Sequence, residues 1–248
     1  MPRQVWRQAG LASIPIPRQI GHVLVVSFST AVSASDTGPM LECLDASERE
    51  RWNRFQSPRV KGEFLAGKAM ARRILGLALG LGARDVRFTH NAKGKPELAD
   101  GPFAFNLSHS HGWALFALTP SGRIGVDIER VRPVTDLMDL ARRYFTPVEV
   151  DAIGMADSSA QLDLFYRVWT RKEAFIKAHG LGVAYGLDRV AVSTDQEVKP
   201  HFARLGEGED PLAWSLEHLE PAPGYVGALA CDTRLADLML VHCLDWMD

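Results

Sequence analysis

Residues 165–177 read FYRVWTRKEAFIK, and this stretch predicts one long helix. Phe165 and Trp169 recur at helical spacing, so one stripe of the helix is expected to pack into a core. Glu173 and Lys177 are one turn apart and lie on one face. Taken alone, such a pair is most often a surface ion pair worth about a few tenths of a kcal/mol.

A second pair of carboxylates lies upstream, in the apolar segment IGVDIE at residues 124–129. Asp127 and Glu129 are two residues apart on a predicted strand, so their side chains project to the same side. Two such carboxylates repel each other unless a cation lies between them, and Mg²⁺ prefers oxygen ligands. Glu173 from the helix is the candidate third ligand. The alternative is a strand end that carries two solvated acids.

The composition is that of an ordinary soluble protein. The 248 residues carry a formal net charge of -2, which gives no sign of a nucleic-acid-binding surface. The three cysteines lack C-x-x-C spacing, so neither a disulfide framework nor a zinc site is indicated. Pro15 and Pro17 interrupt the apolar residues near the N-terminus, and the longest apolar runs have only strand length. We therefore expect a cytoplasmic protein with no membrane segment.

The predicted elements form two halves with the same order of strand, helices and further strands. We expect an N-terminal arm or loop at residues 1–20, a first half at 21–122 and a second half at 123–248. Several identical residues recur 104 positions apart, for example Lys68 and Lys172 (172 - 68 = 104), which suggests a duplication. At that offset Glu173 corresponds to Ala69, so the carboxylate chemistry exists once, in the second half.

Two sequence patterns predict helix starts. Ser47 with Glu50, and Thr146 with Glu149, each match a capping box, in which two side chains satisfy free backbone N–H groups. The second pattern also has a proline at the first helical position, Pro147, where proline is well tolerated. We expect one helix to begin at each pattern.

Several basic residues could neutralise a phosphate group beside a metal ion, although each one taken singly is better explained as a solvated side chain. They are Arg51, Arg59, Lys95, His109 and Lys177. The chain has no Walker-type loop, no dinucleotide fingerprint and no nucleophile elbow. The residues alone therefore indicate a metal-dependent phosphate chemistry without naming it.

Four motifs together resemble those of the 4′-phosphopantetheinyl transferases of the surfactin-synthetase-activating (Sfp) type. They are GKP at 94–96, FNLSHS at 105–110, GVDIE at 125–129 and WTRKEAFIK at 169–177. The resemblance covers roughly residues 47–182, and the combination is specific although each motif alone is not. It implies an α+β fold, a pseudo-dimer of two similar α/β halves with one active site in the cleft between them.

The resemblance also implies a reaction. With Mg²⁺ bound, a serine of an apo acyl or peptidyl carrier protein attacks the β-phosphate of coenzyme A, receives 4′-phosphopantetheine, and adenosine 3′,5′-bisphosphate leaves. Coenzyme A is the substrate, the carrier protein is the partner, and the setting is secondary metabolite biosynthesis. We expect a monomer, because a pseudo-dimer already supplies both sides of the cleft.

The site residues follow from the same resemblance. Asp127, Glu129 and Glu173 would hold the metal, and Lys177 would contact the phosphate under attack. Either Glu173 or a metal-bound water would remove the serine proton, and the sequence leaves both open. The residues implied for coenzyme A are Arg51, Lys61, Lys95, Pro96, Ser108, His109 and Lys177.

One position departs from the family pattern. Glu63 stands where the family commonly has a basic residue that grips the 3′-phosphate of coenzyme A, so that contact is assigned to Arg51 and Lys61 instead. Lys95 and His109 would hold the same phosphate. Two other functions compete with the transferase: another Mg²⁺-dependent phosphotransferase or pyrophosphatase that uses the same acids, and a non-catalytic coenzyme A-binding module.

Overall fold

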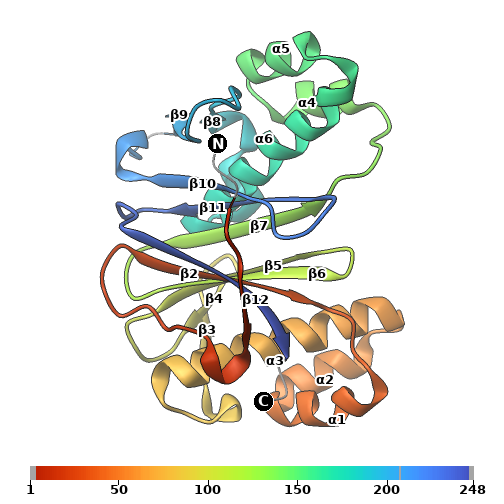
Figure 1. Ribbon diagram of the computed structural model, residues 1–248, viewed down its shortest axis with the longest axis vertical. Coiled ribbons are helices and arrows are strands. Elements are labelled where there is room, and N and C mark those ends of the chain that lie inside the picture. Colours follow the sequence, from red (N-terminus) through yellow and green to blue (C-terminus); the bar gives the residue numbers. More distant parts are fainter. Residues whose placement is uncertain (1–3, 207, 246–248) are drawn as a thin grey trace.

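The computed structural model describes residues 4–206 and 208–245 and shows two central sheets between two groups of helices (Figure 1). The first sheet has the order β1-β12-β2-β6-β5 and the second has the order β10-β11-β7. Two further pairs of short strands, β3-β4 and β8-β9, stand apart from these sheets. The fold is therefore mixed α and β, as predicted.

The strands of the first sheet are β1 (Arg7–Gly10), β2 (His22–Ser29), β5 (Ala104–Ser110), β6 (Trp113–Thr119) and β12 (Asp237–Asp245). Those of the second sheet are β7 (Ile124–Arg130), β10 (Ser215–Leu219) and β11 (Tyr225–Cys231). The short pairs are β3 (Phe88–His90) with β4 (Pro96–Leu98), and β8 (Ala191–Val192) with β9 (Phe202–Arg204). The turn of the β3-β4 hairpin contains Gly94 of the GKP motif, which has a positive φ of 82°.

The helices are α1 (Ala34–Cys43), α2 (Ala46–Arg54), α3 (Pro58–Leu79), α4 (Leu137–Tyr144), α5 (Pro147–Met155) and α6 (Ser158–His179). The helix predicted around residues 165–177 is α6. The capping box of Thr146 and Glu149 is present at the start of α5, as expected. At α2 the prediction was wrong by two residues, since the capping box is formed by Asp45 and Glu48.

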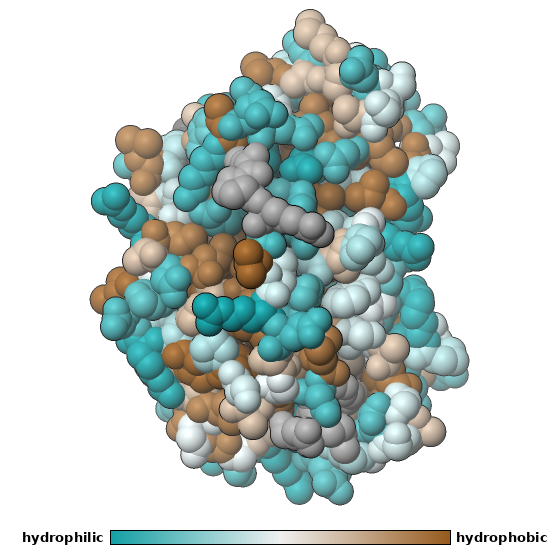
Figure 2. All heavy atoms as spheres, in the orientation of Figure 1, coloured by the Kyte–Doolittle hydropathy of each residue, from teal (hydrophilic) through white to brown (hydrophobic). Residues whose placement is uncertain are grey.

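Four layers result from the way the apolar faces pack. Val25 of β2, Leu115 of β6 and Val126 of β7 belong to one core cluster, which lies between the two sheets. A second cluster joins the outer face of the first sheet to α3, and a third joins the outer face of the second sheet to α6. On the face shown in Figure 2, hydrophobic and hydrophilic side chains are interspersed. In the described part of the chain, no helix is long and apolar enough to cross a membrane.

The two halves repeat one arrangement. In the first sheet β2 pairs with β6 and β6 with β5; in the second β7 pairs with β11 and β11 with β10, and all four pairings are antiparallel. The long helices α3 and α6 each have 22 residues and end at a left-handed glycine, Gly80 and Gly180. These helix ends are 100 positions apart instead of 104, so the offset is not constant along the chain.

Both ends of the described chain depart from the predicted division. Residues 1–20 were expected to form an arm or loop, but Arg7–Gly10 form strand β1, which pairs in parallel with β12. Strand β12, from the predicted second half, lies in the first sheet between β1 and β2. Parallel pairing needs a partner far along the chain, and neither strand reveals that partner in its own sequence.

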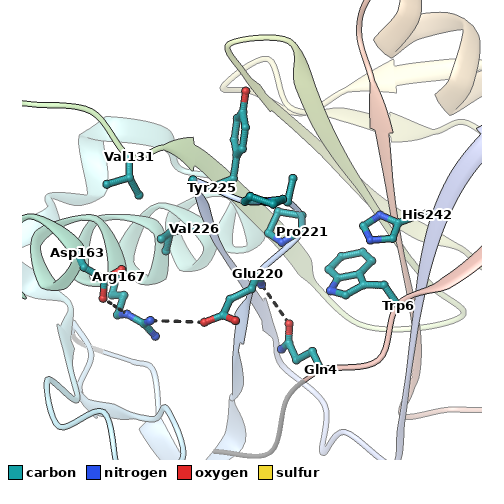
Figure 3. Close-up of a pocket in the computed structure, with 13 residues that line it drawn as sticks. Gln4, Trp6, Val131, Asp163, Arg167, Glu220, Pro221, Tyr225, Val226 and His242 are labelled. Carbon is teal, nitrogen blue, oxygen red and sulfur yellow. Dashed lines mark hydrogen bonds and ion pairs between the residues drawn. The ribbon is translucent and has the colours of Figure 1, made fainter.

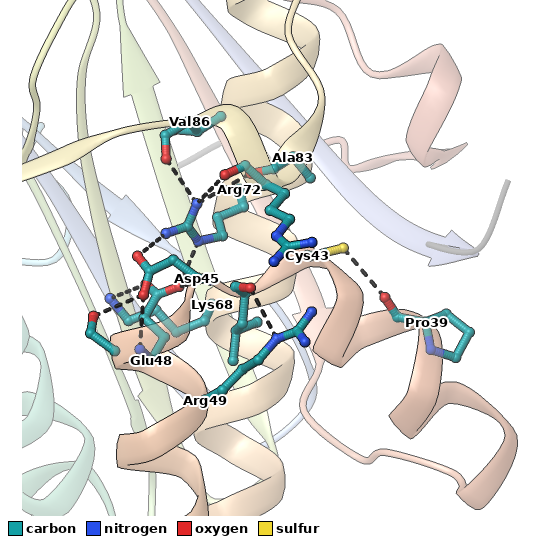
Figure 4. Close-up of polar contacts among 12 residues, drawn as sticks. Pro39, Cys43, Asp45, Glu48, Arg49, Lys68, Arg72, Ala83 and Val86 are labelled. Carbon is teal, nitrogen blue, oxygen red and sulfur yellow. Dashed lines mark hydrogen bonds and ion pairs between the residues drawn. The ribbon is translucent and has the colours of Figure 1, made fainter.

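A buried cluster of charges anchors α3 to the helix before it (Figure 4). The Arg72 guanidinium is 2.5 Å from Asp45 and 2.6 Å from Glu48, and it donates a hydrogen bond to the Val86 carbonyl at 2.8 Å. Lys68 pairs with Glu48 at 3.2 Å. The Arg72 side chain is only 1% exposed, so its charge depends on these partners.

Arg72→Leu is expected to lower the free energy of unfolding by about 3–5 kcal/mol, because it leaves Glu48 buried with one cation fewer. Urea unfolding followed by circular dichroism measures this loss. The matched variant Lys68→Met leaves Glu48 paired with Arg72, so we expect it to cost less than about 1 kcal/mol. Equal losses in the two variants would contradict a central role for Arg72.

Candidate active site

The site lies where the edge strands β5 and β7 meet. Polar side chains at alternate positions of β5 point at β7, where Asn106 Oδ1 accepts a hydrogen bond from the Val126 N–H at 2.9 Å and Ser110 Oγ accepts one from the Arg130 N–H at 3.3 Å. These bonds satisfy backbone donors of β7 on the side where it pairs with no other strand of the described structure. They also fix β5 beside the carboxylates of β7.

Helix α6 approaches β7 closely because residue 125 is glycine. A Cβ atom at Gly125 would lie 2.1 Å from the Ala174 carbonyl oxygen and 2.3 Å from the Ala178 nitrogen, both in α6. Any side chain there would push the helix away from the strand. The glycine of the GVDIE motif therefore allows the helix that carries Glu173 and Lys177 to lie against the strand that carries Asp127.

Asp127 is the buried centre of the site. It is 3% exposed, and its Oδ1 atom accepts hydrogen bonds from Ser108 Oγ at 2.9 Å and from Lys177 Nζ at 2.6 Å. Its second oxygen, Oδ2, is buried without a hydrogen-bond partner among the described residues. A buried carboxylate oxygen without a partner is costly, so this atom is ready to bind a cation or a donor.

The two glutamates of the site are destabilised as anions. Burial, followed by the negative charge of Asp127, raises the pKa of the Glu129 carboxyl, although a hydrogen bond from Ser110 at 2.8 Å opposes the rise. Burial and Asp127 also raise the pKa of Glu173, to which Glu129 adds a smaller repulsion. The three carboxylates are therefore close enough to repel one another, and Lys177 compensates them only in part.

These residues fit a divalent cation. Three carboxylates that repel one another and one unpartnered oxygen are the oxygen-rich, negatively charged surroundings that Mg²⁺ takes. As the side chains stand, no set of three acidic, histidine or cysteine residues in the described chain is arranged to hold a metal, and the Lys177 ammonium neutralises Asp127. The acidic side chains would have to turn toward a bound ion.

Two of the residues predicted to bind coenzyme A lie beside this cluster. Ser108 bonds Asp127 directly, and its Oγ atom accepts a hydrogen bond from Lys177 Nζ at 2.8 Å. His109 is next to it on β5, and its Nδ1 atom lies 3.8 Å from Glu63 Oε2. Burial lowers the pKa of His109, while Glu63 opposes that effect.

Glu63 itself is neutralised by its neighbours. The carboxylate is buried, at 5% exposure, and pairs with Arg59 one turn earlier in α3 at 2.8 Å. An acid at this position therefore does not leave an unpaired negative charge beside His109. The Arg59–Glu63 pair therefore adds almost no net charge beside His109.

The remaining predicted residues lie farther out. Lys95 Nζ donates hydrogen bonds to the Ile124 and Ala178 carbonyls at 3.1 Å each, and burial lowers its pKa to about 8. Pro96 begins β4 next to it. Arg51 stacks over Phe64 and Lys61 over Trp52, at 5.4 and 3.8 Å from the ring centres. In the described structure no hydrogen bond or ion pair joins Arg51, Lys61 or Lys95 to the three carboxylates.

Sequence reasoning missed two residues of the site. Asn106 and Ser110 hold β7 in place, and Ser110 also bonds Glu129. The signal was present in the FNLSHS motif, because Asn106, Ser108 and Ser110 alternate along a strand and so share one face. That face is the one turned toward β7.

A separate pocket of about 600 Å³ is lined by the N-terminal segment, by α6 and by the turn before β11 (Figure 3). Trp6 stacks on His242 in one wall, and Arg167 pairs with Asp163 in another. The Gln4 side chain accepts a hydrogen bond from the Glu220 N–H at 3.0 Å, so the N-terminal segment reaches the second sheet. No residue predicted for the active site lines this pocket.

His218, beside Arg167, should make the protein sensitive to acid. Burial, and then the charge of Arg167, lower its pKa from 6.5 to about 3. Between those two pH values the unfolded chain binds a proton that the folded chain does not, so the free energy of unfolding falls as the pH falls below 6.5. His218→Gln removes this one proton-binding difference, so the free energy of unfolding should change with pH less steeply, by up to about 1.4 kcal/mol per pH unit. Urea unfolding at pH 4.5, 5.5 and 7.5 measures the slope, and His201→Gln, an exposed histidine, is the control.

Known proteins resemble both halves of the chain. Residues 123–230 match the family model described as the 4′-phosphopantetheinyl transferase superfamily, and residues 32–121 match the model for the N-terminal part of 4′-phosphopantetheinyl transferases. The 4′-phosphopantetheinyl transferase HetI of Nostoc sp. is 36% identical over 192 residues, which cover 75% of this chain and 78% of that protein. The 4′-phosphopantetheinyl transferase Sfp of Bacillus subtilis is 32% identical over 195 residues, 78% of this chain and 84% of that protein.

A mixed α and β chain with a carboxylate cluster where its two sheets meet thus has relatives along most of its length. The chain belongs to the 4′-phosphopantetheinyl transferase superfamily.

Proposed function

We propose that the protein transfers 4′-phosphopantetheine from coenzyme A to a serine of an apo carrier protein and releases adenosine 3′,5′-bisphosphate. One observation carries the chemistry. Asp127 has a buried oxygen with no partner among the described residues, pairs with the Lys177 ammonium, and repels the carboxylates of Glu129 and Glu173. The relatives named 4′-phosphopantetheinyl transferase favour this function over a pyrophosphatase or a non-catalytic binding module.

The acidic residues would hold Mg²⁺, which when bound would neutralise charge on the pyrophosphate of coenzyme A. Lys177 of α6, which bonds Asp127, would bind the phosphate under attack. Glu173 would accept the serine proton, since burial and Asp127 raise its pKa and make it a stronger base than an ordinary carboxylate. Ser108 and Ser110 orient Asp127 and Glu129 through hydrogen bonds.

Several finer features belong to the same proposal. The repeated strand order supports a pseudo-dimer of two similar halves, with the substrate in a cleft near the β5–β7 boundary. Lys95, Pro96 and His109 would bind coenzyme A there, and Arg51 and Lys61 would reach its outer end. We also propose an Sfp-type enzyme, because the Sfp protein is among the relatives that match most of the chain. We propose a monomer, because two similar halves in one chain would supply both sides of the cleft.

Mass spectrometry of an apo carrier protein tests the function. After incubation with coenzyme A, the enzyme and Mg²⁺, the carrier should gain the mass of one phosphopantetheine, and a chelator should prevent the gain. Consumption of coenzyme A without modification of the carrier would favour a pyrophosphatase. Thermal stabilisation by coenzyme A and Mg²⁺ without either reaction would favour a binding module.

A further inference from the structure

Lys172, the residue before Glu173 on α6, forms a buried ion pair with Glu149. Lys172 Nζ is 2.6 Å from Glu149 Oε2, and the two side chains are 0% and 1% exposed. The same ammonium donates hydrogen bonds to the Leu187 carbonyl at 3.0 Å and the Val190 carbonyl at 2.5 Å. Lys172 is therefore fully bonded, and it has no atom available for a substrate.

Glu149 connects this lysine to two other elements. Its Oε2 atom accepts a hydrogen bond from the Thr146 N–H at the start of α5, and its Oε1 atom accepts one from the Val192 N–H of β8, each at 2.8 Å. Helix α5, strand β8 and the segment that follows α6 thus converge on one carboxylate and one ammonium. Buried ion pairs with complete hydrogen bonding fix geometry more than they add stability.

We propose that the Glu149–Lys172 pair sets the rotation of α6 and thereby places Glu173 for metal binding. Neighbouring residues on a helix are about 100° apart, so an anchor at Lys172 determines where Glu173 points. A rotation of about 10° at a radius of about 5–6 Å moves a side chain by about 1 Å. Metal–ligand distances tolerate about 0.2 Å, so this displacement is large. Lys172 and Glu149 are positioning residues, and the inference rests on the function proposed above.

The first half contains a related ion pair, whose carboxylate Glu48 is also paired with the Arg72 guanidinium at 2.6 Å. The capping-box residue Glu48 pairs with Lys68 of α3, as Glu149 pairs with Lys172 of α6 (Figure 4). The residue after Lys68 is Ala69, where the second half has Glu173. If the anchor served stability alone, loss of either pair would affect the protein in the same way. If it positions Glu173, only the second pair affects metal binding.

Glu149→Gln and Glu48→Gln are the matched variants, since each turns one capping-box carboxylate into an amide. Both should lower the melting temperature. Only Glu149→Gln should weaken Mn²⁺ binding, measured by calorimetry without coenzyme A, by about tenfold, and raise the Mg²⁺ concentration for half-maximal transfer equally. At saturating Mg²⁺ its kcat should stay within about threefold of wild type, while Glu48→Gln should bind Mn²⁺ as wild type does.

Mn²⁺ affinity unchanged in Glu149→Gln, or weakened equally in both variants, would overturn the proposal. If Glu149→Gln does not fold, Lys172→Arg takes its place, because a guanidinium keeps the charge but cannot repeat the three contacts of the ammonium. Unchanged Mn²⁺ affinity in Lys172→Arg would also contradict the proposal. A wild-type protein that binds no Mn²⁺ and modifies no carrier would instead refute the proposed function.

Discussion

Replacing Asp127 with asparagine is expected to lower kcat/KM for carrier modification about 10³-fold or more. The substitution keeps the shape of the side chain but removes a negative charge that a bound metal and Lys177 both need. Metal ions supply several kcal/mol of charge stabilisation to such transition states, and each 1.36 kcal/mol is a factor of about ten in rate. The measurement is the initial rate of phosphopantetheine addition at several Mg²⁺ concentrations.

The controls separate lost chemistry from lost folding. Circular dichroism and urea unfolding of Asp127→Asn should show a folded protein. Glu42→Gln, which removes an exposed carboxylate of α1, should keep wild-type activity. A fully active Asp127→Asn variant would remove Asp127 from the site and leave the family assignment untouched.

Glu173→Gln should have opposite effects on activity and stability. Activity should fall about 10² to 10⁴-fold, because the variant lacks the carboxylate proposed as a metal ligand or as the general base. The melting temperature in the absence of metal should rise, on the order of a few degrees. The folded state raises the pKa of Glu173, so above its unfolded pKa the ionised carboxylate costs stability, and the neutral amide removes that cost.

The stability part of this prediction is tested by the melting temperature at two pH values. The measurement is differential scanning calorimetry of the metal-free proteins at pH 7.5 and pH 4. The gain in melting temperature should be smaller at pH 4, where the wild-type carboxyl is protonated and therefore as uncharged as the amide. A melting temperature lower than wild type at pH 7.5 would mean that the Glu173 anion is stabilised by partners such as Lys177. Glu217→Gln, on the distant strand β10, should show no such pH-dependent gain.

The sequence predicted the elements that depend on interactions between residues close together in the chain. Helix α6 follows from the spacing of its apolar residues, and the start of α5 from Thr146, Pro147 and Glu149. The start of α2 was misplaced because Asp45 and Ser47 are both good cap residues, and only the contacts of Asp45 with Arg72 favour the first. Helix α1 was not predicted at all, and a proline at position 39 obscures it.

The site shows the same division. The carboxylates could be predicted because two residues on a strand share a face, and because the motif of α6 supplied the third. The approach of α6 to Gly125 and the bonds from Asn106 and Ser110 depend on which strands become edges, a tertiary property. The pairing of Lys172 with Glu149 was equally hidden, since 23 positions separate them in the sequence.

The place of β12 has a consequence for how the chain folds. Residues 237–245 form a strand between β1 and β2, so the first sheet cannot be completed until almost the whole described chain has been synthesised. The second sheet needs nothing beyond residue 231. On the ribosome, therefore, the half that carries the carboxylates can form first, while the half that begins the chain waits for its last strand.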